Sequence, residues 1–395
     1  MTPALSIAWS TLSAFFILET YAPLFFLHKK RNHQTLQTYP PISVILPVKN
    51  EGVVLKKIVR SWLSISYPSP FEIIIADAGS TDGTQQIART FAKENSHVVY
   101  VRLSTNNKFN TVVEGIKKAR YDTIVLSDSD RLVNADAIIR LMPYMTKGVG
   151  AVFGIAQVVK NDSAFQKIST LEYLNIMTDL LFYSAIDSAP YLYLHACIIN
   201  KNLIDDVPHQ QLTADDLYLG LHIRKKGYRS VCIPDVEVGH EQVINISDII
   251  KKRLRTSGGT GEIARSNYLH MMFQKKYGWF GMVVLPFRHA TTIVANILTV
   301  IVSLLTVPVL FSGITNTLVV WAACVYVLLT AGQFLRYAAT KQYWEHTYRT
   351  VPVWAFFLYP FYYLVVRKFF AGAVFMASLS GVKFAWKKTR SDRAV

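Results

Sequence analysis

Two aspartates, Asp128 and Asp130, follow directly on a short hydrophobic run, and their spacing suits the binding of a metal ion. Residues 123–126 are typical of a strand that is buried on both faces. Side chains two residues apart in an extended segment point the same way, so both carboxylates can share one cation that prefers oxygen, such as Mg²⁺ or Mn²⁺. The alternative for an isolated pair of this kind is a solvated, aspartate-rich turn.

A second acidic site lies at the end of residues 71–77, which are also typical of a buried strand. Asp77 ends this run, and a carboxylate at the end of a buried strand needs a polar partner. It can accept a hydrogen bond from the imide N–H of a pyrimidine base. Asp82, five residues later, is better explained as a cap of the next helix.

The third acidic site is the adjacent pair Asp215 and Asp216, at the start of an amphipathic segment. Thr213 and Asp216 also fit the pattern of a capping box, which would make this site purely structural. Neighbouring helical residues do not face each other, so only one of the two aspartates can point into a cleft. We favour Asp216, because apolar residues and a glycine one turn further along share its face.

From residue 40 onward, predicted strands alternate with predicted helices. This order predicts an α/β fold with a doubly wound, mostly parallel sheet and right-handed crossovers. Ligands of such sheets bind beyond the carboxyl ends of the strands, where the acidic sites fall. Strands are predicted at 42–48, 71–77, 98–103, 123–126 and 150–159, and helices at 51–66, 82–93, 109–119, from a cap at Asn134 to 145, and at 163–185.

The composition indicates a protein that is partly dissolved in lipid. Hydrophobic residues make up 51% of the 395 residues, and the mean hydropathy is +0.24. The net charge is +16, and the clusters of basic residues lie beside apolar segments. This favours an anionic membrane surface over nucleic acid as the partner. The three scattered cysteines form no zinc-binding spacing.

Residues 3–27 are long and apolar enough to span a membrane, with Glu19 as the exception. The basic residues at 29–31 follow this segment, so we predict an uncleaved anchor with the next domain in the cytoplasm. Further spans are predicted at 283–307, 310–335 and 351–366, and 369–384 is either another span or an interfacial helix. The predicted division is therefore an anchor at 1–28, an α/β domain at 40–248, basic interfacial helices at 249–282, and transmembrane or interfacial helices at 283–386.

Four motifs in order resemble the signature of the family 2 glycosyltransferases, which have the GT-A fold. They lie at 42–51, 76–82, 127–130 and 214–216. The predicted anchor, the later apolar helices and the sequence Phe-Ala-Trp-Lys-Lys at 384–388 resemble the membrane-integrated branch, which includes ceramide glucosyltransferase, hyaluronan synthase and cellulose synthase. Each motif alone is weak, but four at these spacings are specific.

The resemblance implies a role for each matching position. The branch also has a (Gln/Arg)-x-x-Arg-Trp motif, which falls here on Lys252 to Arg255 with Thr256 in place of tryptophan. This departure argues against a processive polymer synthase. The implied roles are catalysis for Asp216 and Arg255; metal binding for Asp130 and Asp128; and donor binding for Pro47, Lys49, Glu51, Asp77, Lys108, Asp128 and Lys252.

The implied activity is an inverting transfer of a sugar from a nucleotide diphosphate, with UDP expected, to a hydroxyl of a lipid or glycan at the membrane. The implied cofactor is Mg²⁺ or Mn²⁺, and the implied location is the plasma membrane with the catalytic domain in the cytoplasm. No nucleic-acid partner is expected. The alternatives are a polyprenyl-phosphate sugar synthase, a processive polysaccharide synthase and, from a different class, a membrane transporter. A transporter would carry its polar residues at mid-membrane, whereas the acidic motifs lie in the predicted α/β domain.

Overall fold

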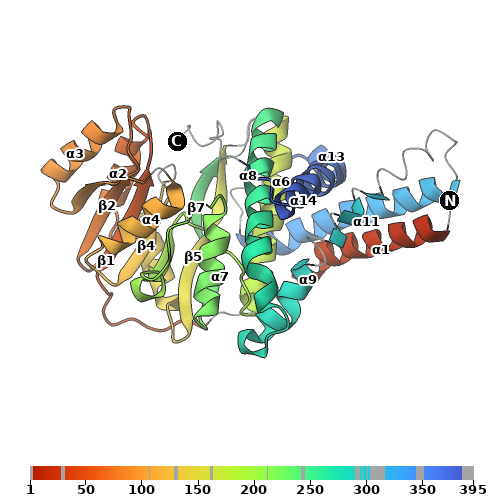
Figure 1. Ribbon diagram of the computed structural model, residues 1–395, viewed down its shortest axis with the longest axis horizontal. Helices are drawn as coiled ribbons and strands as arrows, with labels where there is room; N and C mark the ends of the chain where they lie inside the picture. Colours follow the sequence, from red (N-terminus) through yellow and green to blue (C-terminus); the bar gives the residue numbers. More distant parts are fainter. Residues whose placement is uncertain are drawn as a thin grey trace. The chain divides into compact units, whose positions relative to one another are not determined.

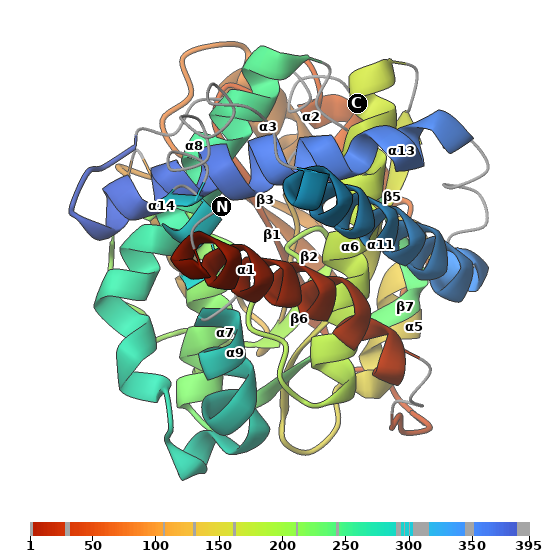
Figure 2. The same ribbon diagram turned by 90° about the vertical axis from the view of Figure 1, so that its right-hand side faces the viewer.

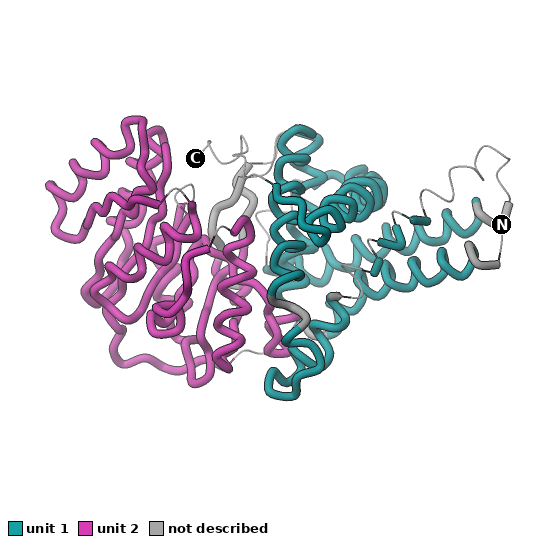
Figure 3. Tube along the Cα trace, viewed as in Figure 1, with its two compact units in different colours: residues 1–28, 161–182, 243–387 teal, residues 29–160, 183–242, 388–395 magenta. Residues whose placement is uncertain are grey.

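The chain divides into two compact units in a computed structural model, and each is described by itself (Figure 3). The helical unit comprises Met1–His28, Asn161–Phe182 and Val243–Lys387. The sheet unit comprises Lys29–Lys160, Tyr183–Gln242 and Lys388–Val395. The structure describes residues 3–27, 32–105, 107–128, 132–160, 163–210, 212–241, 245–289, 294, 295, 297–299, 301, 302, 316–343 and 351–384.

The sheet unit is built on a seven-stranded mixed sheet with the strand order β3-β2-β1-β4-β6-β5-β7 (Figure 1). Four of its pairings, β1 with β2, β1 with β4, β2 with β3 and β5 with β7, are parallel. Strand β6 runs antiparallel to both of its neighbours, β4 and β5. The strands are β1 Ile42–Val48, β2 Phe71–Asp77, β3 Val98–Arg102, β4 Thr123–Leu126, β5 Val149–Lys160, β6 Cys197–Asn200 and β7 Arg229–Glu241.

Helices pack against this sheet through their apolar residues. Every residue of β1 is buried, as expected for a central strand of a sheet that is covered on both faces. Trp62 on α2 is fully buried in the main hydrophobic core. A Cβ atom on Gly115 would lie 2.8 Å from a methyl group of Ile45, so the glycine lets α4 approach the sheet closely. The helices of this unit are α2 Leu55–Leu63, α3 Thr84–Glu94, α4 Lys108–Lys117, α5 Ala137–Leu141 and α7 Asp215–Lys225.

The predicted fold class is confirmed, and several details of the prediction are corrected. The strands at 42–48, 71–77 and 123–126 lie where the hydrophobic runs placed them. Strands β6 and β7 were not predicted. The helix expected from a cap at Asn134 instead begins at Ala137, with Asp136 in the N-cap position, and it ends at Leu141. The short 3₁₀ turn Met142–Tyr144 continues it, because Pro143 cannot donate to a regular helical ladder.

The helical unit consists of long helices, among which α1 and α11 run side by side (Figures 1 and 2). Helices α8 and α14 pack against each other in the same unit. Ser378 on α14 donates a hydrogen bond of 2.6 Å to the Gly258 carbonyl on α8. The main helices are α1 Pro3–Tyr21, α6 Ala164–Ala185, α8 Ile246–Ile263, α9 Leu285–His289, α11 Asn316–Thr340, α13 Val353–Tyr362, η10 Tyr363–Phe370 and α14 Ala371–Leu379.

Two helical segments, Val319–Thr340 and Val353–Leu379, are long and apolar enough to cross a membrane by length and composition. The second corrects the prediction, because the segments expected at 351–366 and 369–384 form one run through α13, η10 and α14. Lys368 therefore lies inside that run, where its Nζ atom is 2.5 Å from the Glu19 carboxylate. Glu19 thus faces other helices. Much of the span predicted at 283–307 lies outside the described residues.

Candidate active site

The centre of the candidate site is Asp128, which follows the buried strand β4. Its Oδ1 atom lies 2.8 Å from the Nζ atom of Lys108, the first residue of α4. The other oxygen, Oδ2, lies 3.2 Å from Nδ1 of His195. Two cationic or proton-donating groups therefore hold this carboxylate. Its predicted neighbour in the metal motif, Asp130, lies outside the described residues.

His195 reaches Asp128 because β6 runs antiparallel to β4. Leu126 at the end of β4 is paired with Cys197 at the start of β6, so the residues just beyond β4 meet those just before β6. The Asp128 N–H donates to the Leu194 carbonyl at 3.0 Å, which fixes this crossing. His195 is 7% exposed, and its ring packs edge-on against Tyr193.

Asp215 shares the Lys108 ammonium group with Asp128. Its Oδ2 atom lies 3.1 Å from the Nζ atom of Lys108, so one ammonium group bridges two carboxylates. Asp216 accepts a hydrogen bond of 2.8 Å from the N–H of Leu217, and its carbonyl accepts from Leu192. The N-cap position of α7 falls on Ala214, so the capping box suggested by Thr213 is not formed there.

Packing between α4 and α7 keeps Lys108 and Asp215 together. Phe109, next to Lys108, contacts Tyr218 on α7 edge-on, with 5.2 Å between the ring centroids. Gln210 joins the same two helices, since its N–H donates to Asn110 and its side-chain amide donates to the Tyr218 hydroxyl. The packing of α4 against α7 therefore fixes the positions of the two residues of this ion pair.

Opposing effects act on the pKa values of this cluster. Burial would raise the pKa of Asp128, but the Lys108 ammonium and the His195 imidazole hold it well below its ordinary value. Desolvation would lower the pKa of Lys108, but the Asp128 and Asp215 carboxylates keep it well above its ordinary value. Both groups are charged at neutral pH.

The predicted base contact, Asp77, is fully buried at the end of β2. One of its oxygens accepts from the N–H and the hydroxyl of Ser80, and the other accepts from the Tyr100 hydroxyl at 2.8 Å. These contacts are the partners that its burial required. Asp82 accepts from the N–H of Thr84, the first residue of α3, although the N-cap position itself falls on Gly83.

The end of β1 and the loop after it carry three predicted donor-binding residues, and this loop is tied to the loop after β2. Pro47 lies in β1, where it is paired with Ala76, and Lys49 and Glu51 follow the strand. The Glu51 N–H donates to the Thr84 hydroxyl at 2.7 Å. Asn50 has a left-handed conformation with φ of 55°, and its side chain accepts from the Thr81 N–H. The loops after β1 and β2 are thus joined by hydrogen bonds at the same edge of the sheet.

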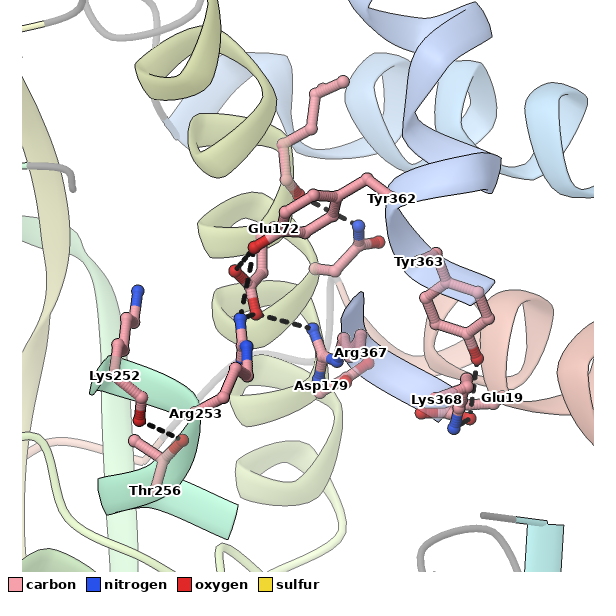
Figure 4. A network of polar contacts seen from close by, with 12 residues as sticks. Glu19, Glu172, Asp179, Lys252, Arg253, Thr256, Tyr362, Tyr363, Arg367 and Lys368 are labelled. Carbon is pink, nitrogen blue, oxygen red and sulfur yellow. Dashed lines mark hydrogen bonds and ion pairs between the residues drawn. The ribbon is translucent and has the colours of Figure 1, made fainter. Parts of the chain in front are cut away.

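Lys252 and Arg255 lie on α8, which belongs to the helical unit. Figure 4 shows Lys252 extending away from Arg253, which turns towards Glu172 on α6. Lys252 is 9% exposed, and its ammonium group lies 4.3 Å from the centre of the Tyr173 ring. Burial lowers the pKa of Lys252 to about 7, although the Glu172 carboxylate opposes this shift.

Glu172 is the centre of a polar network in the helical unit (Figure 4). Its carboxylate accepts hydrogen bonds from Arg253 and from the Tyr362 hydroxyl, and Arg367 lies 3.8 Å away. Burial would raise the pKa of Glu172, but the nearby cations lower it to about 2. This network joins α6, α8, α13 and η10.

Within the described residues, no three histidine, cysteine or acidic side chains are grouped so that they alone could hold a metal ion. Asp128 nevertheless offers carboxylate oxygens that already hold the Lys108 ammonium, so the position attracts cations. Mg²⁺ and Mn²⁺ sites commonly combine one or two protein carboxylates with the phosphates of a substrate. The residues present therefore fit a divalent cation that is bound together with a nucleotide.

Sequence reasoning missed His195. Its choice of Asp216 as the base stays a prediction, although Asp215 is the residue that lies beside Lys108. The signal for His195 was weak, because the apolar run of β6 is only four residues long. The signal for Asp215 was present in the adjacent pair, but helical periodicity alone does not decide which residue points towards a lysine more than 100 positions earlier.

Comparison with known proteins relates part of the sheet unit to a family. Residues 43–208 match the family described as Glycosyl transferase family 2. A poly-beta-1,6-N-acetyl-D-glucosamine synthase of Staphylococcus epidermidis is 34% identical over 151 residues, which cover 38% of this chain and 35% of that protein. Its Staphylococcus aureus counterpart is 25% identical over 246 residues, which cover 60% of this chain and 58% of that protein. The matches thus span less than two thirds of these relatives.

Among solved structures, the mannosyltransferase PcManGT from Pyrobaculum calidifontis, in complex with GDP-Man and Mn²⁺, has the same fold. The TM-score is 0.67 at 17% sequence identity, and the alignment covers 87% of this chain and 99% of that chain. The α/β sheet described above is therefore a GT-A sheet.

Proposed function

We propose that this chain, which belongs to glycosyl transferase family 2 through residues 43–208, transfers a sugar from a nucleotide diphosphate to an acceptor hydroxyl. The observation that carries this proposal is the Lys108 ammonium between Asp128 and Asp215. Asp128 lies beyond the carboxyl end of a central strand, where ligands bind in open α/β sheets. The Lys108 ammonium can bind a diphosphate, and the carboxylate beside it can accept a proton.

The proposed reaction is a single in-line displacement at the anomeric carbon. The acceptor oxygen forms the new bond, while the bond from the anomeric carbon to the diphosphate breaks and its electron pair leaves with the diphosphate. A carboxylate takes the hydroxyl proton. A single displacement inverts the configuration at the anomeric carbon, whereas a double displacement through a carboxylate nucleophile would retain it.

Two neighbouring aspartates are candidates for this base. Asp216 was the sequence-based prediction and remains a candidate. The contact with Lys108 favours Asp215, which lies beside the proposed donor site. A polyprenyl phosphate acceptor is already ionised and needs no base, so a functional base at either position would favour a hydroxyl acceptor.

A divalent cation bound by Asp128, together with Asp130, would neutralise charge on the leaving diphosphate. Lys108, Lys252 and Arg255 are the proposed cationic contacts of the same group. Pro47, Lys49, Glu51 and Asp77 are the proposed contacts on the nucleotide side, and we expect UDP. The solved mannosyltransferase binds GDP-Man with Mn²⁺, so GDP is the first alternative nucleotide.

The proposed acceptor is a lipid or glycan at the cytoplasmic face of the plasma membrane. The two helical segments long enough to cross a membrane support this location. A processive synthase is the second candidate, because both matched staphylococcal relatives are named as polymer synthases. The threonine at position 256, where the membrane-integrated branch has tryptophan, favours single transfer instead.

The test is a thermal-shift panel of UDP, GDP, ADP and CDP, each with Mn²⁺ and with a chelator. Ligands that bind only the folded state raise the melting temperature. We expect one nucleoside diphosphate to stabilise the protein when Mn²⁺ is present and much less with the chelator. If none of the four stabilises the protein in Mn²⁺, the proposed function is wrong.

A further inference from the structure

Lys108 connects the two halves of the proposed reaction. Its Nζ atom lies 2.8 Å from Asp128 on the donor side and 3.1 Å from Asp215, the candidate base favoured by the geometry. These carboxylates come from the end of β4 and from the first turn of α7, which are distant in sequence. One ammonium group therefore neutralises a donor-side carboxylate and a candidate base together.

This bridge can be displaced by a ligand. Lysine is a compact charge on a flexible stem, and its three N–H donors can change partners. The side chain of Lys108 is 43% exposed, so a bound anion can reach it. A diphosphate forms strong charge-assisted hydrogen bonds with ammonium groups, and a divalent cation competes for the Asp128 carboxylate. Donor binding therefore acts on both ends of the bridge.

The bridge also determines what Asp215 can do. The Lys108 ammonium lies 3.1 Å from Oδ2 of Asp215, so an acceptor hydroxyl has to compete with this ion pair for the carboxylate. The packing of Phe109 against Tyr218 keeps α4 and α7 in place, so the lysine side chain can move without a shift of either helix. The exchange of partners needs only rotations within the side chain.

We propose that Lys108 is a tethered cation that couples donor binding to release of the base. In the empty protein it holds Asp215, and when the donor binds it moves onto the diphosphate and leaves Asp215 free to accept the hydroxyl proton. Lys108 is then a positioning residue for Asp215 as well as a donor contact. This inference rests on the proposed function, and it makes the donor the first substrate to bind productively.

The proposal predicts that Asp215 opposes nucleotide binding. Removing its charge frees Lys108 for the diphosphate, so Asp215→Asn should bind the nucleotide more tightly. A partly exposed ion pair of this kind corresponds to roughly a two- to fivefold change in affinity. The measurement is calorimetric titration of UDP, and of GDP, into the full chain at saturating Mn²⁺.

Two controls separate this effect from a general loss of negative charge. Asp206→Asn removes a charge that pairs with His222 and Lys226 at the end of α7, and it should leave the affinity close to that of the parent. In a Lys108→Met background, Asp215→Asn should no longer tighten binding, because the two changes act through one contact. Melting temperatures of all variants establish that the protein titrated is folded.

A second measurement needs no nucleotide. Lys108→Met leaves Asp128 and Asp215 without their shared cation, so the affinity for Mn²⁺ alone, measured by electron paramagnetic resonance, should rise. An Asp215→Asn affinity for nucleotide equal to that of Asp206→Asn overturns the coupling, and so does tightening that persists in the Lys108→Met background. If the parent protein binds neither nucleotide with Mn²⁺, the proposed function itself fails, which is a different result.

Discussion

The neighbouring residues Asp215 and Asp216 differ in what their carboxylates contact, and this difference can be tested by turnover. Asp215 faces Lys108, whereas Asp216 accepts from the backbone of its own helix. Asparagine keeps the shape of either side chain but does not take a proton at neutral pH. A general base contributes about 10²- to 10⁴-fold. We expect Asp215→Asn to lower sugar transfer by that order and Asp216→Asn to lower it much less, with both proteins folded. The reverse order would favour Asp216, the sequence-based prediction, as the base.

Lys252 gives a second prediction at the scale of one residue. Burial lowers its pKa to about 7, from 10.5 for the exposed group. Between these values the unfolded chain holds a proton that the folded protein lacks, so stability contributed by this residue rises with pH. We expect the melting temperature of the parent protein to rise relative to that of Lys252→Met between pH 7 and pH 9.5. Parallel profiles would show that Lys252 is not perturbed by burial.

At the scale of elements, the position of α7 depends on Gly220. A Cβ atom there would lie 2.6 Å from the Pro190 carbonyl oxygen, so the glycine lets α7 approach the segment that leads to His195. Gly220→Ala must push these segments apart, at a cost of about 1–3 kcal/mol. We expect a lower melting temperature and reduced turnover, because Asp215 moves with the helix.

The matched control for this change is Gly83→Ala. A Cβ atom on Gly83 meets no atom within 4 Å, and the residue has ordinary helical dihedral angles. Equal effects of the two substitutions on stability and turnover would contradict the assignment of a packing role to Gly220.

The polar network around Glu172 joins helices of the helical unit, and it should be sensitive to loss of the Glu172 carboxylate. Glu172→Gln leaves Arg253 buried without a counter-charge, and breaking a buried pair in this way costs about 3–5 kcal/mol. Glu114→Gln, at the partly exposed pair with Lys117, should cost about 1 kcal/mol or less. Thermal melts of the two variants in detergent compare these costs, and similar shifts would mean that the network contributes little.

The elements also show what the sequence could predict. The continuous apolar runs of β1, β2 and β4 identified three strands and the carboxylates at two of their ends, because a buried strand has a strong local signal. The four-residue β6 has no comparable signal, and its antiparallel direction is set by pairing with distant strands. The contact between Lys108 and Asp215 likewise depends on the packing of α4 against α7. Local patterns therefore identified the candidate residues but not the pairing among them.

For the whole molecule, the sequence composition and the helices give the same prediction about location. Val319–Thr340 and Val353–Leu379 can each cross a membrane by length and composition. We expect the full chain to remain with the membrane fraction after washing with alkaline carbonate, which removes peripheral proteins but not those with spanning helices. Release into the supernatant would show that these helices pack within a soluble protein.

The position of β6 in the sheet has a consequence for biosynthesis. The strands β1 to β4 can pair with one another as soon as residue 126 has left the ribosome, because they form one parallel block. The pair β5 and β7 joins that block only through β6, and β7 ends at Glu241. Asp77, Lys108 and Asp128 therefore belong to the part of the nascent chain that can fold first, and His195 and Asp215 arrive later. The growing polypeptide cannot bring His195 and Asp215 to Lys108 and Asp128 until β5, β6 and β7 have paired with the first four strands. The candidate active site is therefore completed only at the end of domain synthesis.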